Sequence, residues 1–559
     1  MTSPALSPEM AKRLASLTPA QRELFERALK KKEARPEPAA APGASPVIPR
    51  RTGEGPWPLS LDQERFWRHQ RRNPASPVYN IVGANRFRGR LDVAAFARAL
   101  NEVVRRHESL RTTFREVEGR PVQEVASEYR MPLPVIDLRA LPHHRREAEA
   151  ERAIFRVLRE PFDLERLPLL RMFLVQAEDD DFIRPFSIHH AVNDHLSVWN
   201  MEADLIASYA AFVAGRQPEL PLPPFQQADF AVWQRERLSD PKLLAERLAW
   251  WRERLDGFPD PLDFPFDRPR PPVQRPWGER RPLEISRARS EGLRALAQRE
   301  GVTLFMAGLA IFDALLVRLT GQEKLIVGTP MTYSEALVDG LLGFYLNQVP
   351  LPVDLSGNPP FREALRRVRD SVLGAHAHND LPLQLLVEEL RGEPDPSFFP
   401  FTQVTFLLLD PPKIVGAEVP GLSPRRYPVD GKRTQYDTQL ALFWEEGVGL
   451  NGMWEYNTDL FHRTTADRFK EHFRVLLGGV VADPDTPILD LPLLPEGERQ
   501  TLREWSDAAG VHLLDRRGGP VPIGVVGEVH SADTEGRLSA TGERARWLWN
   551  GSIEKVSRS

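Results

Sequence analysis

The residues of this chain that could most readily do chemistry lie together in the stretch SIHHAVNDHLSVW, residues 187–199. His189, His190, Asp194 and His195 fall within seven consecutive positions of it. The run FIRPFSIHHAV is strand-like, and consecutive side chains of a strand point to opposite faces. We therefore expect one of the two adjacent histidines to face a site while the other packs internally. An imidazole, whose pKa lies near neutrality, can accept a proton from an attacking amine or hydroxyl.

Three interpretations of this segment are open from the residues alone. The first is an ordinary polar turn without chemistry. The second is a metal site formed by His189, His190, Asp194 and His195. Adjacent histidines rarely converge on one ion, however, and no second cluster of ligands follows downstream, so we expect no metal. The third is acyl transfer with a histidine as the base, in which Asp194 pairs with an arginine to order the turn or orients the imidazole.

Length and composition narrow the class of protein. A chain of 559 residues is too long for one ordinary core, so we expect at least two lobes. Hydrophobic residues make up 41% and charged residues 27%, as in soluble globular proteins, and no apolar run could cross a bilayer. The first residues lack the apolar core of a secretory signal, and the net charge of −4 gives no general attraction to nucleic acid. We expect a cytoplasmic monomer that binds neither nucleic acid nor membrane.

The absence of cysteine has a chemical consequence. It removes disulfides, thiolate metal sites and a cysteine nucleophile together. If thioester chemistry takes place, the thiol must therefore come from a partner or a cofactor.

Periodic segments on both sides of residues 187–199 predict the elements that position it. LDVAAFARALNEVVRRHESL (91–110) has the apolar stripe of an amphipathic helix, and LSVWNMEADLIASYAAFVAG (196–215) is typical of a helix ended by glycine. Further on, KLIVGTP (324–330) predicts a buried strand, and 401–410 and 440–457 alternate as strands do. The pattern as a whole indicates an α/β protein.

The segment HHAVNDH (189–195) resembles the HHxxxDG motif of the condensation domains of nonribosomal peptide synthetases. Further segments resemble the other motifs of that family in the same order. They are LSLDQERFW (59–67), RHESLRTTF (106–114), QADFAVWQ (227–234), LIVGTPMTY (325–333), GFYLNQVPL (343–351) and HNDLPLQLL (378–386). The resemblance covers about residues 57–499.

The resemblance implies an α/β (α+β) fold of two chloramphenicol-acetyltransferase-like lobes in a V-shaped pseudo-dimer with a central tunnel. It implies that an acyl or peptidyl group arrives on the phosphopantetheine arm of an upstream donor carrier protein. The acceptor amine then arrives on a downstream carrier protein or as a free small molecule, and the product is an amide. The resemblance implies no bound cofactor.

The resemblance also carries roles to individual residues. It places His190 in the tunnel as the base or as a group that positions the amine, with His189 beside it as support. It gives Asp194 a structural role through an ion pair with an arginine, for which Arg318 is the first candidate and Arg111 the second. Breaking such a buried pair should cost about 3–5 kcal/mol.

The chain departs from the family where the motif's glycine is replaced by His195. We expect this histidine to narrow the tunnel, to change the acceptor or to abolish condensation. Asn347, Gln348 and Trp199 are further candidates for the tunnel wall. Related X-type domains, which recruit oxidases, resemble the family with the second histidine replaced, so the retained His190 favours catalysis.

Three other functions stay open. One is a catalytically impaired scaffold that binds carrier proteins, another is an ester-forming enzyme, and the third is a relative that uses an acyl-CoA donor. A requirement for a carrier-bound donor in place of a CoA-bound donor would exclude the last of these.

The C-terminal residues resemble two pieces from late in an adenylation domain, HLLDRRGGPVPIGVVGEVH and ATGERARWLWNGSIEKVSR. Residues 512–559 are too few to form a nucleotide-activating domain, so we predict an adenylation-domain remnant that does not use ATP. The predicted organisation is a helical docking segment (1–32), a Pro/Ala-rich linker (33–56), a first lobe (57–240), a second lobe (241–499), and a linker with the remnant (500–559).

Overall fold

The computed structural model describes the chain in six stretches, residues 48–333, 340–392, 395–409, 421–429, 431–532 and 537–556. The predicted docking segment at 1–32 lies outside them, as does most of the predicted linker. The part of the linker that is described packs on the protein, because Ile48 is buried in a cluster with Phe225, Phe230 and Tyr345.

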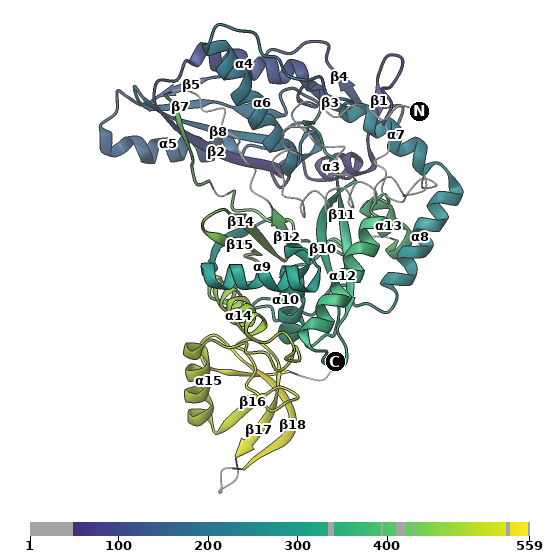
Figure 1. Cartoon of the computed structure of the whole chain (residues 1–559), viewed down its shortest axis with the longest axis vertical. Coiled ribbons are helices and arrows are strands. Elements are labelled where there is room, and N and C mark those ends of the chain that lie inside the picture. Colours follow the sequence, from purple (N-terminus) through teal and green to yellow (C-terminus); the bar gives the residue numbers. More distant parts are fainter. Residues whose placement is uncertain are drawn as a thin grey trace, which may run out of the picture. The chain divides into compact units, whose positions relative to one another are not determined.

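The first lobe is built on a sheet with β8 (Asp181–His189) near its centre (Figure 1). The strand order is β13-β2-β8-β7-β5, with β6 also paired to β8. The other strands are β2 (Asn80–Arg88), β5 (Val135–Asp137), β6 (Leu170–Met172), β7 (Leu174–Glu178) and β13 (Ser423–Arg426). Strand β13 comes from the second half of the chain and pairs antiparallel with β2, so this sheet extends beyond the predicted boundary at residue 240.

Both faces of β8 are buried, each under a different set of helices. Phe182, Phe186 and Ile188 point to one face and belong to the cluster that includes α4 (Val93–Arg106) and α6 (His195–Val213). Ile183 points to the other face, into the cluster that includes α5 (His143–Leu158). The period of two in a strand sends alternate residues to the two clusters. The end of β8 is therefore rigidly held.

The helix expected at 91–110 ends at Arg106, and η1 (Glu108–Arg111) follows it.

A small sheet and three helices complete the first half of the chain. The sheet has the strand order β1-β4-β3. The three helices are α3, which follows β1, and α7 and α8, which follow α6. Their bounds are β1 (Trp57–Pro58), β3 (Thr112–Val117), β4 (Arg120–Val125), α3 (Leu61–Arg72), α7 (Gln227–Leu238) and α8 (Pro241–Leu255).

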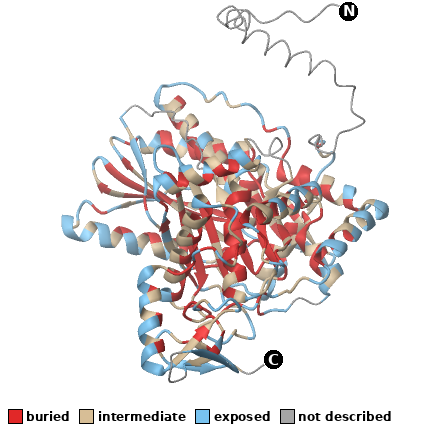
Figure 2. Ribbon diagram, turned by 60° about the horizontal axis from the view of Figure 1, so that its bottom comes forward, coloured by how far each residue is buried: buried red, intermediate tan, exposed pale blue. Residues whose placement is uncertain are grey.

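The second lobe has a six-stranded sheet of order β11-β10-β12-β14-β15-β9. Its strands are β9 (Gly278–Glu284), β10 (Lys324–Thr332), β11 (Leu346–Asp354), β12 (Val404–Leu409), β14 (Thr438–Glu445) and β15 (Gly449–Asn457). The helices of this lobe are α9 (Arg287–Glu300), α10 (Leu304–Thr320), α12 (Phe361–Ala377), α13 (Leu383–Arg391) and α14 (Arg463–Ala482). Helix α10 is buried along nearly its whole length. Figure 2 shows that buried residues gather in the central strands, whereas exposed residues lie on the outer helices.

The C-terminal residues form α15 (Glu496–Ala509) and a sheet of order β16-β17-β18-β19, drawn in yellow in Figure 1. The strands are β16 (Val511–Leu514), β17 (Gly527–Ala532), β18 (Leu538–Trp547) and β19 (Ile553–Lys555). Leu513, Val529 and Trp547 belong to the same hydrophobic cluster as the core of the second lobe. This segment is therefore packed onto that lobe.

Within the described residues no single helix is long and apolar enough to cross a membrane. Helices α9 and α10 reach that length and apolar composition only when they are taken together, and their axes meet at a bend of 107°.

Candidate active site

The turn after β8 separates the two adjacent histidines. Strand β8 ends at His189, and η2 (His190–Val192) leads to Asp194, the N-cap of α6. His189 is buried, its Nδ1 accepts the backbone N–H of Ala191 at 3.1 Å, and burial lowers its pKa to about 3. His189 is thus packed inside the protein and bonded to the backbone of the turn.

His190 is held in one tautomer. Its Nδ1 lies 3.0 Å from the backbone carbonyl oxygen of Asn193, and because a carbonyl can only accept, Nδ1 carries the proton. Nε2 is therefore left with a lone pair that can accept a proton or a hydrogen bond. Burial, with smaller contributions from His195 and Arg65, lowers the pKa of His190 well below its usual value, so the ring is neutral near pH 7.

Aromatic rings fix the plane of His190. Phe66 stacks on it with ring centroids 5.8 Å apart and an angle of 8° between the planes. Phe344, which precedes β11, and His195 each meet it edge-on at 5.6 Å. The sequence does not single out Phe66 or Phe344. Phe66 does lie inside the motif-like segment 59–67.

The first turn of α3 supports the η2 turn that carries His190. Ser60 and Gln63 form a capping box, and the side-chain amide of Gln63 donates to the carbonyl of Ala191 at 3.0 Å. Through this bond the segment 59–67, far away in sequence, supports the turn that begins at His190.

His195 is the first residue of α6 and is exposed. Protein nonetheless surrounds the ring closely enough that desolvation lowers its pKa, and Arg280 lowers it further while Glu455 opposes this. Arg280 and Glu455 are register partners on β9 and β15 and form an ion pair of 2.6 Å. The side chain that replaces the motif's glycine therefore lies close enough to charged residues of the second lobe to be affected by them electrostatically.

The expected ion pair between Asp194 and an arginine is wrong. The buried carboxylate of Asp194 accepts the backbone N–H groups of Ser197 at 2.8 Å and of Tyr345 at 3.0 Å. One N–H donor from the first turn of α6 and one from the segment before β11 satisfy this carboxylate without a cation. Burial still raises the pKa of Asp194, because these bonds only partly offset the loss of water.

Both candidate arginines have other partners. Arg318, on α10, donates to the carbonyl of Leu491 at 3.0 Å and lies 3.9 Å from Asp515 of the C-terminal segment. Arg111 donates to the carbonyl of Ala126 and lies 4.0 Å from Glu108. Neither arginine supports the site directly.

Among the predicted tunnel residues, Asn347 is committed to backbone groups. Its amide donates to the carbonyls of Asn379 at 2.8 Å and Leu381 at 2.7 Å and accepts the N–H of Leu383 at 3.0 Å. Asn347 therefore braces the segment before α13 and does not offer its amide to a ligand. Gln348 and Trp199 are half-buried, and their role in a tunnel stays a prediction.

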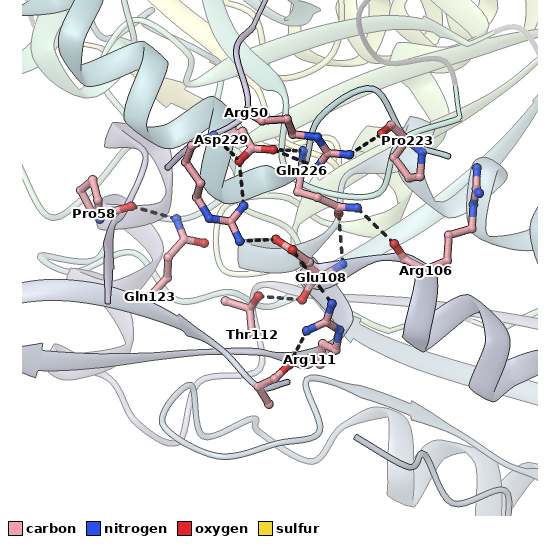
Figure 3. Close-up of polar contacts among 12 residues, drawn as sticks. Arg50, Pro58, Arg106, Glu108, Arg111, Thr112, Gln123, Pro223, Gln226 and Asp229 are labelled. Atoms are coloured by element: carbon pink, nitrogen blue, oxygen red, sulfur yellow. Dashed lines mark hydrogen bonds and ion pairs between the residues drawn. The ribbon is translucent and has the colours of Figure 1, made fainter. Parts of the chain in front are cut away.

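A polar network braces the segment that leads into β1 (Figure 3). Asp229 accepts from Arg50 at 3.1 Å and from Arg51 at 2.7 Å, and Arg51 also reaches Glu108 at 2.7 Å. Gln226 donates to the carbonyl of Arg106 at 3.1 Å. The motif-like segments 106–114 and 227–234 are thus joined to each other and to the entering chain.

Among the residues that the structure describes, no group of three or more His, Cys, Asp or Glu side chains is arranged to hold a metal ion.

Comparison with protein families identifies relatives of this chain. The family model described as "Condensation domain" matches residues 54–503. One of the linear gramicidin synthase proteins of Brevibacillus parabrevis is 41% identical over 82% of this chain, and phosphinothricin tripeptide synthetase PhsC of Streptomyces viridochromogenes is 39% identical over 89%. The aligned regions span only 9% and 45% of those two proteins.

Solved structures show the same fold. The X-domain from teicoplanin biosynthesis matches with a TM-score of 0.73 and 27% identity, covering 80% of this chain and 100% of that one. The first condensation domain of the calcium-dependent antibiotic synthetase, in complex with a substrate analogue, matches with a TM-score of 0.66 and 22% identity, covering 78% of this chain and 99% of that one. The mixed α/β, chloramphenicol-acetyltransferase-like fold class predicted from the sequence is confirmed.

Proposed function

The chain belongs to the condensation-domain family, and from that premise we propose that it transfers an acyl or peptidyl group from a carrier-protein phosphopantetheine thioester to an acceptor amine. The observation that carries the proposal is the state of His190. Its Nδ1 is tied to the carbonyl of Asn193, and the ring is neutral near pH 7, so Nε2 offers a lone pair to the acceptor.

The chemistry follows from that lone pair. The acceptor nitrogen attacks the thioester carbonyl carbon and forms the C–N bond. Nε2 of His190 either takes the proton from this nitrogen or positions the amine by accepting a hydrogen bond from it. The tetrahedral intermediate then breaks the C–S bond. The phosphopantetheine thiol leaves with the proton, and an amide remains on the acceptor. The phosphopantetheine arm belongs to a carrier partner and is part of the substrate.

A partner-binding scaffold is the second candidate function. The similarity to the X-domain from teicoplanin biosynthesis, which has also been solved in a complex with OxyB, favours it, as does the replacement of the motif's glycine by His195. The retained His190, held in a defined tautomer, favours catalysis over this alternative.

For the C-terminal segment we propose descent from an adenylation domain, which its sequence resemblance supports. Its shared hydrophobic core with the second lobe supports a structural role for it in this chain.

Intact-mass detection of the product tests the proposed activity. The full chain is mixed with acyl-loaded carrier proteins and a panel of carrier-bound and free amines, and wild type is compared with His190→Ala. Alcohol acceptors and acyl-CoA donors are included as separate arms. We expect amide product from carrier-bound donors with wild type and a rate about 10²–10⁴-fold lower with His190→Ala.

The His144→Phe variant is the matched control, because His144 is exposed on α5 and has no part in the site. Carrier binding, measured with the same loaded carriers, separates the two candidate functions. Binding without product from wild type across the panel would favour the scaffold. Product from alcohols alone or from acyl-CoA alone would instead assign the chain to an ester-forming or a CoA-dependent enzyme.

A further inference from the structure

At positions 190 and 195 the family motif has a histidine and a glycine, whereas this chain has two histidines. Their imidazole rings lie next to each other. The ring centroids of His190 and His195 are 5.6 Å apart, and their planes meet at 61°. His195 is exposed, and His190 is half-buried. At this separation the two rings are in contact, so a thioester carbonyl with its attacking nitrogen would reach both of them from beside the pair, at the ring edges, and not from between them.

The two rings have complementary hydrogen-bonding capacity. The carbonyl of Asn193 fixes the proton of His190 on Nδ1, so the other nitrogen of that ring can only accept. Among the described residues, no hydrogen bond of this kind fixes the ring of His195, which meets His190 edge-on. A neutral imidazole without such a tether can turn an N–H toward a carbonyl oxygen.

The N-terminus of α6 is the feature beside His195 that favours negative charge at that oxygen. His195 is the first residue of α6, where the helix dipole presents its positive end and the backbone N–H groups of the first turn point outward. The N-cap carboxylate of Asp194 is occupied by Ser197 and Tyr345. From the second lobe, Arg280 and its ion-pair partner Glu455 act on the ring with opposite electrostatic effects.

We infer that His195 donates an N–H hydrogen bond to the carbonyl oxygen of the donor thioester and stabilises the negative charge that this oxygen acquires when the amine attacks. This inference rests on the proposed function. The C–N bond forms while the carbonyl electron pair moves to oxygen and the amine proton moves to His190. The electron pair on the oxygen re-forms the carbonyl as the C–S bond breaks, and the leaving thiol takes the proton from His190. His195 is therefore neither protonated nor deprotonated over the cycle.

Substitutions at position 195 separate hydrogen-bond donation from the volume of the ring. His195→Phe keeps a ring and removes the N–H, whereas His195→Gln supplies a side-chain N–H₂ of similar reach. We expect His195→Phe to lower kcat about 10²–10³-fold, the range for the loss of one oxyanion donor, with KM for the acceptor little changed. His195→Gln should stay within about 10-fold of wild type, because the donor is restored.

Matched measurements keep the test decisive. His195→Ala serves as a second donor-free variant, and melting temperature and carrier binding are measured for every variant. His144→Phe, on the exposed side of α5, controls for the exchange of a histidine for phenylalanine.

Three outcomes would overturn the inference. The first is a His195→Phe variant with kcat within about threefold of wild type. The second is an equal loss of kcat in His195→Phe and His195→Gln, and the third is a rise in the acceptor KM with kcat unchanged, which would assign His195 to acceptor binding. If wild type itself forms no product while carriers bind, the proposed function has failed, and that result is distinguishable from all three.

Discussion

The carboxylate of Asp194 joins the N-terminus of α6 to the backbone of Tyr345, 151 residues later in the chain, through a hydrogen bond of 3.0 Å. The same carboxylate caps α6 through Ser197. Phe344, which precedes Tyr345, packs edge-on against His190. One buried side chain therefore fixes both the helix that begins at His195 and the segment that supplies an aromatic wall of the site.

This double role predicts that Asp194→Ala is more costly than the loss of an ordinary N-cap. Removal of a cap costs about 0.5–2 kcal/mol, and leaving the buried N–H of Tyr345 unpaired adds about 1–3 kcal/mol. Asp240→Ala is the matched control, because Asp240 is an exposed N-cap that serves only α8. Urea denaturation of both variants measures the difference in the free energy of unfolding. Equal losses would show that the bond to Tyr345 contributes nothing.

The neutral state of His190 predicts its behaviour on titration. Burial lowers the pKa of this imidazole well below 6.5, so acidification from pH 8 to pH 6 should leave it unprotonated. Histidine ring resonances in ¹³C-labelled protein, assigned by comparison with His190→Gln, measure this directly. We expect no midpoint for His190 in that range, and a midpoint near 6.5 would contradict the environment described for the ring.

Asp62, in the first turn of α3, predicts a pH dependence of stability. Burial raises its pKa to about 6, against smaller opposing effects of Arg65 and the hydrogen bond from Tyr333. The folded state then holds a proton that the unfolded chain releases above about pH 4. This contribution to stability is complete below about pH 4 and is lost as the pH rises through about 6.

A shift of this size corresponds to at most about 3 kcal/mol. Denaturation of wild type and Asp62→Asn at pH 4, 5, 6 and 7 tests it, because asparagine keeps the shape and does not titrate. The stability of wild type relative to the variant should fall over this interval. A difference that is constant with pH would mean that Asp62 keeps an ordinary pKa in the folded protein.

Two tryptophans of the C-terminal segment test whether it is part of the fold of the second lobe. Trp547 is 1% exposed and lies in the core cluster of that lobe, whereas Trp549 is 63% exposed. Trp547→Ala should lower the free energy of unfolding by about 3–5 kcal/mol, the range for a buried tryptophan, and Trp549→Ala by less than about 0.5 kcal/mol. Thermal unfolding followed by circular dichroism measures both. Similar small effects would indicate a segment that unfolds independently.

Local rules were enough to predict the elements around the site. The strand-like run before them predicted that the two histidines lie where a strand ends, and β8 ends at His189. The segment 196–215, typical of a helix ended by glycine, predicted α6. The order of the motif-like segments predicted the family, which the match over residues 54–503 confirms. These features depend on neighbours in sequence or on short patterns, so they can be read without coordinates.

What the sequence by itself could not determine is which distant groups meet. The partner expected for Asp194 was an arginine, yet the chain brings the N–H of Tyr345 to it and sends Arg318 to Leu491 and Asp515. A carboxylate is satisfied by backbone N–H groups as well as by a cation, and composition does not distinguish the two. The approach of His195 to the charged residues of β9 and β15 likewise depends on how the lobes pack, which tertiary structure alone decides.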